Sequence, residues 1–359
     1  MKKRWGCVGL LVVLVGWLLC VAAASQVVEK EDCMYLASLH YTANGMDYWY
    51  SKERGGLETL TGIPYDSLGC KNCHAPGCDR CHKEEIVRKD CTVSSYSTDA
   101  ATNQSMCLKC HGREKAMIGI DHKAGKEDVH ILQDMVCTDC HSQHEMHGDG
   151  TRFISLKQPG AMDTRCENCH DSIKPVESHT VHNNRLDCKA CHLRHVVSCT
   201  NCHFDTLVKK GVRKAIPVSG WLFLMNHNGK VSSASMQTFV TGKNKTFLMF
   251  APHMSHSVTK KGRACDECHG TPNALQVQKG QIRLTWLENG TVVNQKGVIP
   301  VVDGVDYSCS YQHYVDGKWI PVENPMKPLV QYAAFGDPLT ADQLKKMVVK
   351  QEPPPPKME

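Results

Sequence analysis

Hydrophobic residues are concentrated in a few segments of this chain, and polar residues occupy most of the rest. One apolar stretch runs from Cys7 to Ala24 directly after three basic residues at positions 2–4. A basic start, an apolar run and small residues at Ala22 and Ala24 are typical of an export signal. We expect residues 1–24 to be a signal peptide and the remainder to be secreted to the cell surface or beyond, with no membrane span after cleavage. A retained anchor is the alternative.

Two later blocks combine apolar segments, such as Trp221–Leu224 and Thr246–Phe250, with turn signals. Turn residues of this kind between apolar runs favour β-hairpins. We expect small antiparallel sheets in a β-rich insertion at 213–250 and in a β-rich C-terminal region at 271–335. Residues 336–359, which include four consecutive prolines, are expected to form a solvated tail. The turn signals are Asn228-Gly229, Thr241-Gly242, Asn289-Gly290, Asp303-Gly304 and Asp316-Gly317.

The composition leaves little side-chain material for a core. Hydrophobic residues make up 41% of the chain, and this figure includes 21 Cys; the chain also has 20 His. Thiols at this density exclude an ordinary cytosolic enzyme. A balance of 42 Lys and Arg against 37 Asp and Glu gives a net charge of +5. We find no strongly basic footprint, so we expect no nucleic-acid partner.

Sixteen of the cysteines occur in eight Cys-x-x-Cys-His motifs. Two thiols three residues apart can reach the two vinyl groups of one haem, and the next imidazole can then ligate its iron. A zinc site would use the Cys pairs two by two and would not explain a His after every pair. We therefore predict eight covalently bound c-type haems. The motifs comprise Cys70, Cys73 and His74; Cys78, Cys81 and His82; Cys107, Cys110 and His111; Cys137, Cys140 and His141; Cys166, Cys169 and His170; Cys188, Cys191 and His192; Cys199, Cys202 and His203; Cys265, Cys268 and His269.

Twelve further histidines lie outside the motifs, and eight would complete eight bis-histidine haems. His227 and His313 lie beside hairpin signals, where a solvated surface position is expected. Methionine is a weaker candidate for the sixth ligand because histidine is in surplus. The ten candidate distal ligands are His40, His122, His130, His144, His147, His179, His182, His195, His253 and His256.

Three pairs of these candidates are spaced three residues apart. On a helix this spacing places both rings on one face, so His179 with His182, and the pair at 253 and 256, are expected to serve two neighbouring haems. For His144 and His147, a supporting or surface role for one member is an equal alternative.

The motif spacing divides the chain into regions. We expect an N-terminal segment at 25–69, a seven-haem region at 70–212 and the eighth haem at 251–270. Motifs one and two, and motifs six and seven, are so close in sequence that their haems should be packed pairs. The predicted fold is a mostly irregular and α-helical multihaem cytochrome with a haem-stack core, plus small antiparallel β elements in the C-terminal third. Because haems replace side chains in this core, the chain without haem is not expected to fold.

Outside the leader and the motifs, Cys33, Cys91 and Cys309 remain. One disulfide and one free thiol is the simplest arrangement, with the pairing left open. Asn103, Asn244 and Asn289 begin N-glycosylation triplets, which a secreted glycoprotein would present on its surface.

Eight haem-attachment motifs, surplus histidine, an export leader and a haem-poor β-rich region together resemble the extracellular cytochrome filaments of archaea and metal-reducing bacteria. The resemblance covers residues 70–269. It implies electron transfer without enzymatic activity, other copies of the chain as partners in a filament, and redox proteins or extracellular acceptors as electron partners. In such filaments a distal ligand often comes from the next subunit, and by resemblance His40 is a candidate for this role.

Two alternatives remain from the sequence. Octahaem reductases and oxidases of small nitrogen or sulfur oxyanions keep one haem open, often marked by Lys in place of the motif His, whereas all eight motifs here end in His. A soluble monomeric electron shuttle is the other alternative.

Overall fold

The computed structural model describes residues 34–68, 75–88, 91–242 and 244–351. The expected signal peptide, the first motif with Cys70, Cys73 and His74, Cys33 and the proline run lie outside these residues. Within these ranges the α-helices are short, and the longest has 12 residues. They are α2 (Leu39–Thr42), α3 (Asn44–Tyr50), α4 (Glu58–Thr61), α5 (Asp79–His82), α6 (Thr98–Thr102), α7 (Gln104–Cys107), α8 (Gly112–Lys123), α9 (Cys137–Cys140), α10 (Gln143–His147), α11 (Glu177–His182), α12 (Cys188–His192), α13 (Phe204–Lys210), α14 (Pro272–Gln276) and α15 (Ala341–Met347).

One mixed sheet of seven strands dominates the fold. Its order is β10-β4-β3-β5-β6-β14, and β15 adds to β4. β4 and β5 pair antiparallel through their shared hairpin, while β3 lies between them further along, antiparallel to β4 and parallel to β5. The parallel strands β10 and β14 extend the two sides. The bounds are β3 (Val196–His203), β4 (Ile216–His227), β5 (Lys230–Thr241), β6 (Lys245–Pro252), β10 (Gly297–Pro300), β14 (Leu329–Tyr332) and β15 (Gly336–Asp337).

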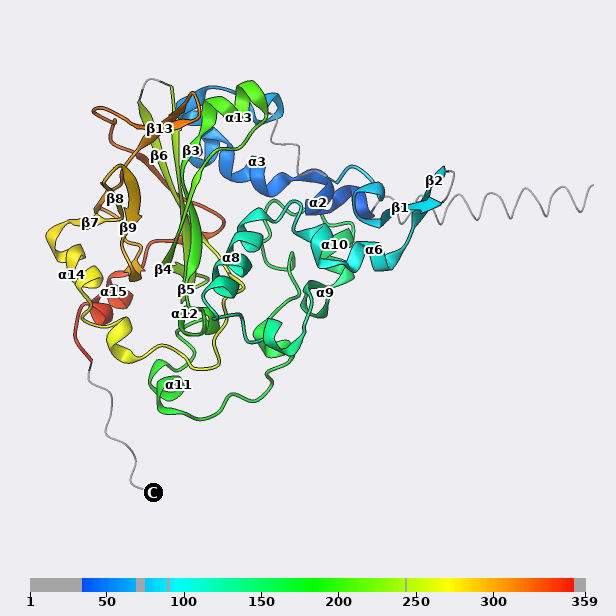
Figure 1. Ribbon diagram of the computed structural model, residues 1–359. Helices are drawn as coiled ribbons and strands as arrows, with labels where there is room; N and C mark the ends of the chain where they lie inside the picture. Colours follow the sequence, from blue (N-terminus) through cyan, green and yellow to red (C-terminus); the bar gives the residue numbers. More distant parts are fainter. Residues whose placement is uncertain (1–33, 69–74, 89–90, 243, 352–359) are drawn as a thin grey trace, which may run out of the picture.

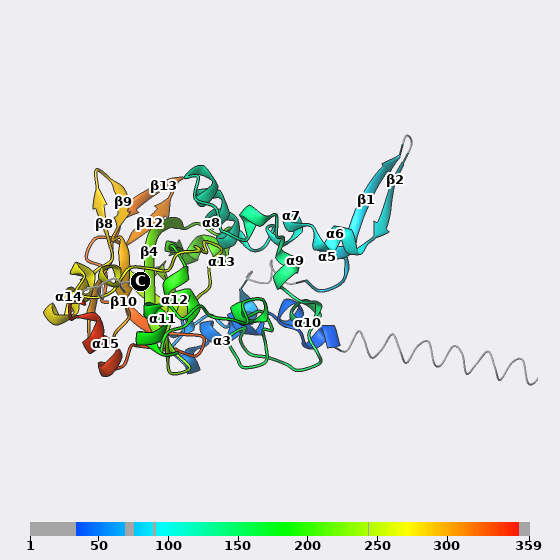
Figure 2. The ribbon, with the colours of Figure 1, turned by 90° about the horizontal axis from the view of Figure 1, so that it is seen from below.

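The remaining strands form two-stranded ribbons. Figure 2 shows the β1–β2 hairpin projecting away from the rest of the chain. The other ribbons lie beside the main sheet in the C-terminal region (Figure 1). They are β1 (Lys83–Arg88) with β2 (Cys91–Tyr96), β7 (Gln281–Arg283) with β11 (Asp306–Ser308), β8 (Thr285–Glu288) with β9 (Thr291–Asn294), and β12 (Gln312–Val315) with β13 (Lys318–Pro321).

The main hydrophobic core belongs to the sheet. Trp221, Phe223 and Phe250 are fully buried in it, and Ile299 from β10 packs in the same cluster. A second cluster joins the N-terminal helices to the sheet through Tyr50 and other residues. Large apolar side chains such as these each contribute on the order of 1.5–3 kcal/mol when buried. The sheet region therefore has a core made of its own side chains.

The expected fold class is wrong. Strand makes up 27% of the structure, and the principal element is the seven-stranded mixed sheet rather than a mostly helical haem stack with small β additions. The reason is that the two β-rich blocks do not form separate sheets. β10 and β14, which follow the eighth motif, align parallel to β4 and β6, which precede it. The seventh motif lies within β3 and joins the same sheet.

Three of the predicted hairpin turns are confirmed. Asn228-Gly229, Asn289-Gly290 and Asp316-Gly317 connect antiparallel hairpins, and all six of these residues have positive φ. This is the conformation that two-residue hairpin turns require, and Asn, Asp and Gly adopt it most readily. The region expected as a solvated tail contains β15 and α15, and Met347 of α15 is buried.

Candidate functional site

A cavity of about 3710 Å³ lies between the motif-bearing segments and the sheet. Ordinary small-molecule pockets measure about 300–1,000 Å³, so this space suits several large ligands rather than one. Both cysteines and the histidine of motifs two, three, four, five, six and eight line it. Gln237, Phe239 and Met249 contribute from the sheet side.

These six motifs share one local conformation. In five of them the backbone N–H of the histidine donates to the backbone carbonyl of the first cysteine at 2.9–3.0 Å. The remaining one, Cys188–His192, forms the short helix α12. A single helical turn of this kind brings the two thiols and the imidazole to the same side of the chain. All three groups of each motif can therefore face one ligand in the cavity.

Each of these six motif histidines faces a histidine from elsewhere in the chain. Their ring centroids lie 6.1–6.3 Å apart. A metal–nitrogen bond of about 2 Å on each side, with each centroid roughly 1 Å further out, gives a separation of about 6 Å. The gaps therefore match one iron with two axial imidazoles. The pairs are His82 with His147, His111 with His40, His141 with His256, His170 with His130, His192 with His179, and His269 with His182.

The orientation of the ring nitrogens is compatible with iron ligation. In several of these histidines Nδ1 lies against a backbone carbonyl, so it carries the proton and leaves Nε2 for the gap. For example, the Nδ1 of His182 is 2.6 Å from the Ser178 carbonyl, and the Nδ1 of His269 is 2.7 Å from the Lys346 carbonyl. The same arrangement holds for His82, His179 and His192 at 2.9–3.1 Å.

Four of the ten candidate distal ligands face none of the seven described motif histidines. His195 is bonded through Nε2 to Asp121 at 2.8 Å and through Nδ1 to the Gly220 N–H, so both ring nitrogens are occupied. His144 lies between Asp163 and Asp149. His122 has a side chain that is 76% exposed, with its Nδ1 2.9 Å from Glu127. His253 lines the cavity beside Glu114.

Two histidines that we expected on the surface are placed elsewhere. The ring of His313 lies 5.7 Å from that of His203, the histidine of the seventh motif, and perpendicular to it. His227 lines the cavity, and its Nε2 is buried without a hydrogen-bond partner. The position of His313 could not be predicted from the sequence, because His313 is on a separate ribbon 110 residues after the histidine that it faces.

The seventh motif differs from the other described motifs because it is extended. The His203 N–H donates to the carbonyl of Lys214, two residues before β4, rather than to Cys199. Cys202 packs with Phe239 in one buried cluster, whereas His203 is paired with Val240, which belongs to another cluster. Successive residues of a strand point to opposite faces. One haem therefore cannot be bound by Cys202 and ligated by His203 unless the end of β3 leaves the sheet.

The thiols of the six cavity motifs form a continuous series. Burial raises the pKa of Cys81, and the thiols of the third motif raise it further. In the same way, a thiol of one motif raises the pKa of a thiol in the neighbouring motif for motifs three and four, four and five, five and six, and six and eight. The thiols of successive motifs therefore lie close together. The residues concerned are Cys107 with Cys137, Cys140 with Cys169, Cys166 with Cys188, and Cys191 with Cys268.

Three carboxylates beside the histidine pairs were missed in the sequence. Glu145 is bonded to His141, Glu114 to His256, and Asp128 to His130, each at Nδ1. Burial tends to raise the pKa of Glu114, but its bond to His256 and the neighbouring His253 and Arg113 lower it to about 2. Glu145 and Asp128 lie within four residues of their histidines, so spacing could have suggested them, whereas Glu114 is 142 residues from His256.

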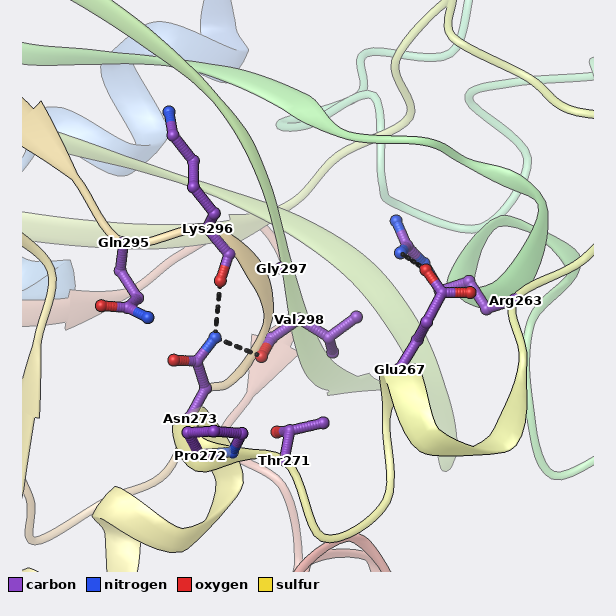
Figure 3. A pocket seen from close by; sticks show the side chains of 9 residues that line it. All are labelled: Arg263, Glu267, Thr271, Pro272, Asn273, Gln295, Lys296, Gly297 and Val298. Carbon is purple, nitrogen blue, oxygen red and sulfur yellow. Dashed lines mark hydrogen bonds and ion pairs between the residues drawn. The ribbon is translucent and has the colours of Figure 1, made fainter. Parts of the chain in front are cut away.

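A smaller hollow of about 270 Å³ lies behind the eighth motif, between α14 and β10 (Figure 3). The polar side chains that line it are hydrogen-bonded to other parts of the chain. The Asn273 side-chain amide donates to the carbonyls of Lys296 and Val298, and Arg263 donates to Glu267 and to backbone carbonyls near α12. We assign no ligand to it.

The structure also places Cys309 and the asparagines of the three glycosylation triplets. Cys309 packs between two hydrophobic clusters, is not in a disulfide within the described residues, and has its pKa raised to about 12 by burial. Asn103 caps α7, Asn289 is in a hairpin turn, and the Asn244 side-chain amide donates to Glu323.

The comparisons with known proteins identify no relative. No family model, curated protein or solved structure matches this chain. Across the residues that the structure describes, no helix has the length and apolar character needed to cross a membrane.

Proposed function

We propose that this protein transfers electrons outside the cytoplasm through a row of covalently bound c-type haems. The observation that carries the proposal is the set of six imidazole pairs at 6.1–6.3 Å around one cavity, each joining a motif histidine to a distant one. A haem iron with two axial histidines accepts and releases single electrons without binding a substrate. The export leader in the sequence favours an oxidising compartment, where such attachment motifs are used.

The residues of the chain have distinct tasks in this proposal. The Cys pairs hold each haem edge, the motif histidine and its partner ligate the iron, and the carbonyl or carboxylate at Nδ1 fixes each ring. Because the thiols of successive motifs approach one another from motif two to motif six and then motif eight, electrons would pass along the cavity in that order.

The competing enzymatic function requires one iron with an open coordination position. Among the described residues, all seven motif histidines face a second imidazole. This arrangement favours electron transfer over catalysis. Electron paramagnetic resonance of the secreted protein tests the choice: electron transfer predicts low-spin signals alone, and a high-spin signal from one iron in eight would favour an octahaem enzyme.

We further propose that copies of the chain assemble into a filament, as the sequence resemblance implies. The interior of the sheet does not supply the contact, because β5 is almost wholly buried within one chain. The projecting β1–β2 hairpin is the better candidate. Val87 is 80% exposed at its tip, with Ile86 beside it at 41%. An isolated two-stranded hairpin is only marginally stable in water, so packing against another copy would stabilise it.

A further inference from the structure

The imidazole pair of the fourth motif has a carboxylate behind each ring. The Nδ1–H of His141 donates to Oε2 of Glu145 at 2.6 Å, and the Nδ1–H of His256 donates to Oε2 of Glu114 at 2.7 Å. The two rings face each other at 6.3 Å. Both ligands of one proposed iron are therefore hydrogen-bonded to an anionic group.

The other five cavity pairs lack this feature. Their Nδ1 atoms meet backbone carbonyls at five histidines, and only His130 has a carboxylate, Asp128, at 3.0 Å. The ring that faces His130, His170, has no carboxylate partner among the described residues. Within the described part of the chain, carboxylates are hydrogen-bonded to both rings of the pair of His141 and His256, to one ring of one other pair, and to no ring of the rest. Glu114 also lies close enough to His111, in the pair of the third motif, to influence it electrostatically.

Both carboxylates have little exposure to solvent and are held in place by neighbouring polar groups. One oxygen of Glu145 accepts from the N–H groups of Asp163 and Thr164 at 2.6 Å and from the Thr164 hydroxyl at 2.8 Å. The other oxygen accepts from His141, and the side chain is 2% exposed. Glu114 is 16% exposed and also lies 3.5 Å from the ring of His253. At such low exposure solvent screens these charges weakly.

A carboxylate that accepts the Nδ1 proton makes the imidazole a stronger electron donor at Nε2. A stronger donor, together with nearby negative charge, stabilises the ferric over the ferrous state and lowers the reduction potential. We infer that Glu114 and Glu145 are positioning residues that give the iron between His141 and His256 the lowest reduction potential of the six cavity sites. This inference rests on the proposed haem function.

The position of this site gives the inference a consequence for electron flow. Motif four is third in the series of six that runs through motifs two, three, four, five, six and eight. An electron moving along the row must therefore pass through an interior site that is harder to reduce than its neighbours. The two glutamates would determine how far the reduction potential of this site lies below those of its neighbours.

The test is a spectroelectrochemical redox titration of the secreted holoprotein and three variants, Glu114→Gln, Glu145→Gln and the double variant. Glutamine keeps an oxygen that can accept from the imidazole but removes the charge. The lowest-potential component, equal to one haem, should move to higher potential in each single variant and further in the double variant. The other components should stay in place, except for a smaller shift at the neighbouring site of His111 when Glu114 is changed. Its low-spin resonance signal should shift as well. Glu127→Gln is the matched control, because Glu127 bonds His122, which faces none of the seven motif histidines that the structure describes.

Unchanged titration curves in both single variants, or an equal shift of every component, would overturn the inference even if all haems are present. The absorption spectrum and mass of the wild-type protein report separately on the proposed function. A wild-type protein without haem would overturn both proposals, whereas normal haem content with an unmoved component overturns only this one. Two single variants protect the test against a folding failure in either.

Discussion

His144 and His147 lie three residues apart on α10, yet of the two only His147 faces a motif histidine within the described residues. Its ring is 6.1 Å from that of His82 and within 20° of parallel to it. The ring of His144 is instead bonded to Asp163 at 2.7 Å, with Asp149 at 3.4 Å from its other nitrogen. The sequence could not distinguish the two, because what separates them is the position of acidic residues on a neighbouring loop.

This difference provides a matched pair of substitutions. We expect His147→Ala to remove one axial ligand and to convert one iron in eight from low spin to high spin. His144→Ala should leave all irons low-spin, because both nitrogens of that ring lie against carboxylates, those of Asp163 and Asp149. Electron paramagnetic resonance of the oxidised proteins measures both. A high-spin signal in the His144 variant, or none in the His147 variant, would contradict the assignment.

Loss of all haems should affect the two parts of the chain differently. From the sequence we expected no folding without haem, but the sheet has a core of side chains such as Trp221, Phe223 and Phe250. Residues 98–189, in contrast, bury few large hydrophobic side chains besides Met117 and Phe153. In a variant with all motif cysteines changed to serine, limited proteolysis should digest residues 98–189 rapidly and spare much of 193–350. Equal digestion of both parts would show that the sheet also depends on haem.

The seventh motif tests how far attachment can reshape the fold. A haem there requires Asn201–His203 to leave β3, which sacrifices a few ladder hydrogen bonds at roughly 1 kcal/mol each. Covalent attachment and iron ligation exceed this cost, since metal ligation alone contributes about 10 kcal/mol or more in small metal sites. We therefore expect the intact mass to show eight haem additions, falling to seven in a Cys199→Ser/Cys202→Ser variant. A wild-type mass with seven additions, unchanged in that variant, would mean that the strand persists.

Assembly is predicted to depend on the projecting hairpin. Val87→Asp places a charge on its most exposed apolar side chain and should convert filaments into monomers. Val349→Asp is the control, because Val349 is also exposed, at 51%, but follows α15 far from the hairpin. Electron microscopy of secreted material distinguishes the outcomes. Monomers in the unaltered protein at all salt concentrations would leave a soluble electron shuttle.

Local chemistry was easier to predict from this sequence than long-range pairing. The attachment motifs and the Asn-Gly and Asp-Gly turns depend on a few adjacent residues, and the spacing of His179 and His182 correctly placed two rings on one helix. The single large sheet was not predicted because β10 and β14 pair with strands 70 or more residues earlier. The sequence of a strand does not indicate which distant strand it will pair with. The same limit hid His313 and Glu114, whose positions beside histidines follow from the tertiary fold.

Peptide mass mapping of the secreted protein tests the central claim most directly, since it asks whether the cavity motifs carry haem. We expect one haem on each of six peptides, attached through both cysteines of the motif, and no alkylation of these thiols. The cysteine pairs are Cys78 and Cys81, Cys107 and Cys110, Cys137 and Cys140, Cys166 and Cys169, Cys188 and Cys191, and Cys265 and Cys268. Recovery of these peptides with free or disulfide-bonded thiols would contradict the account.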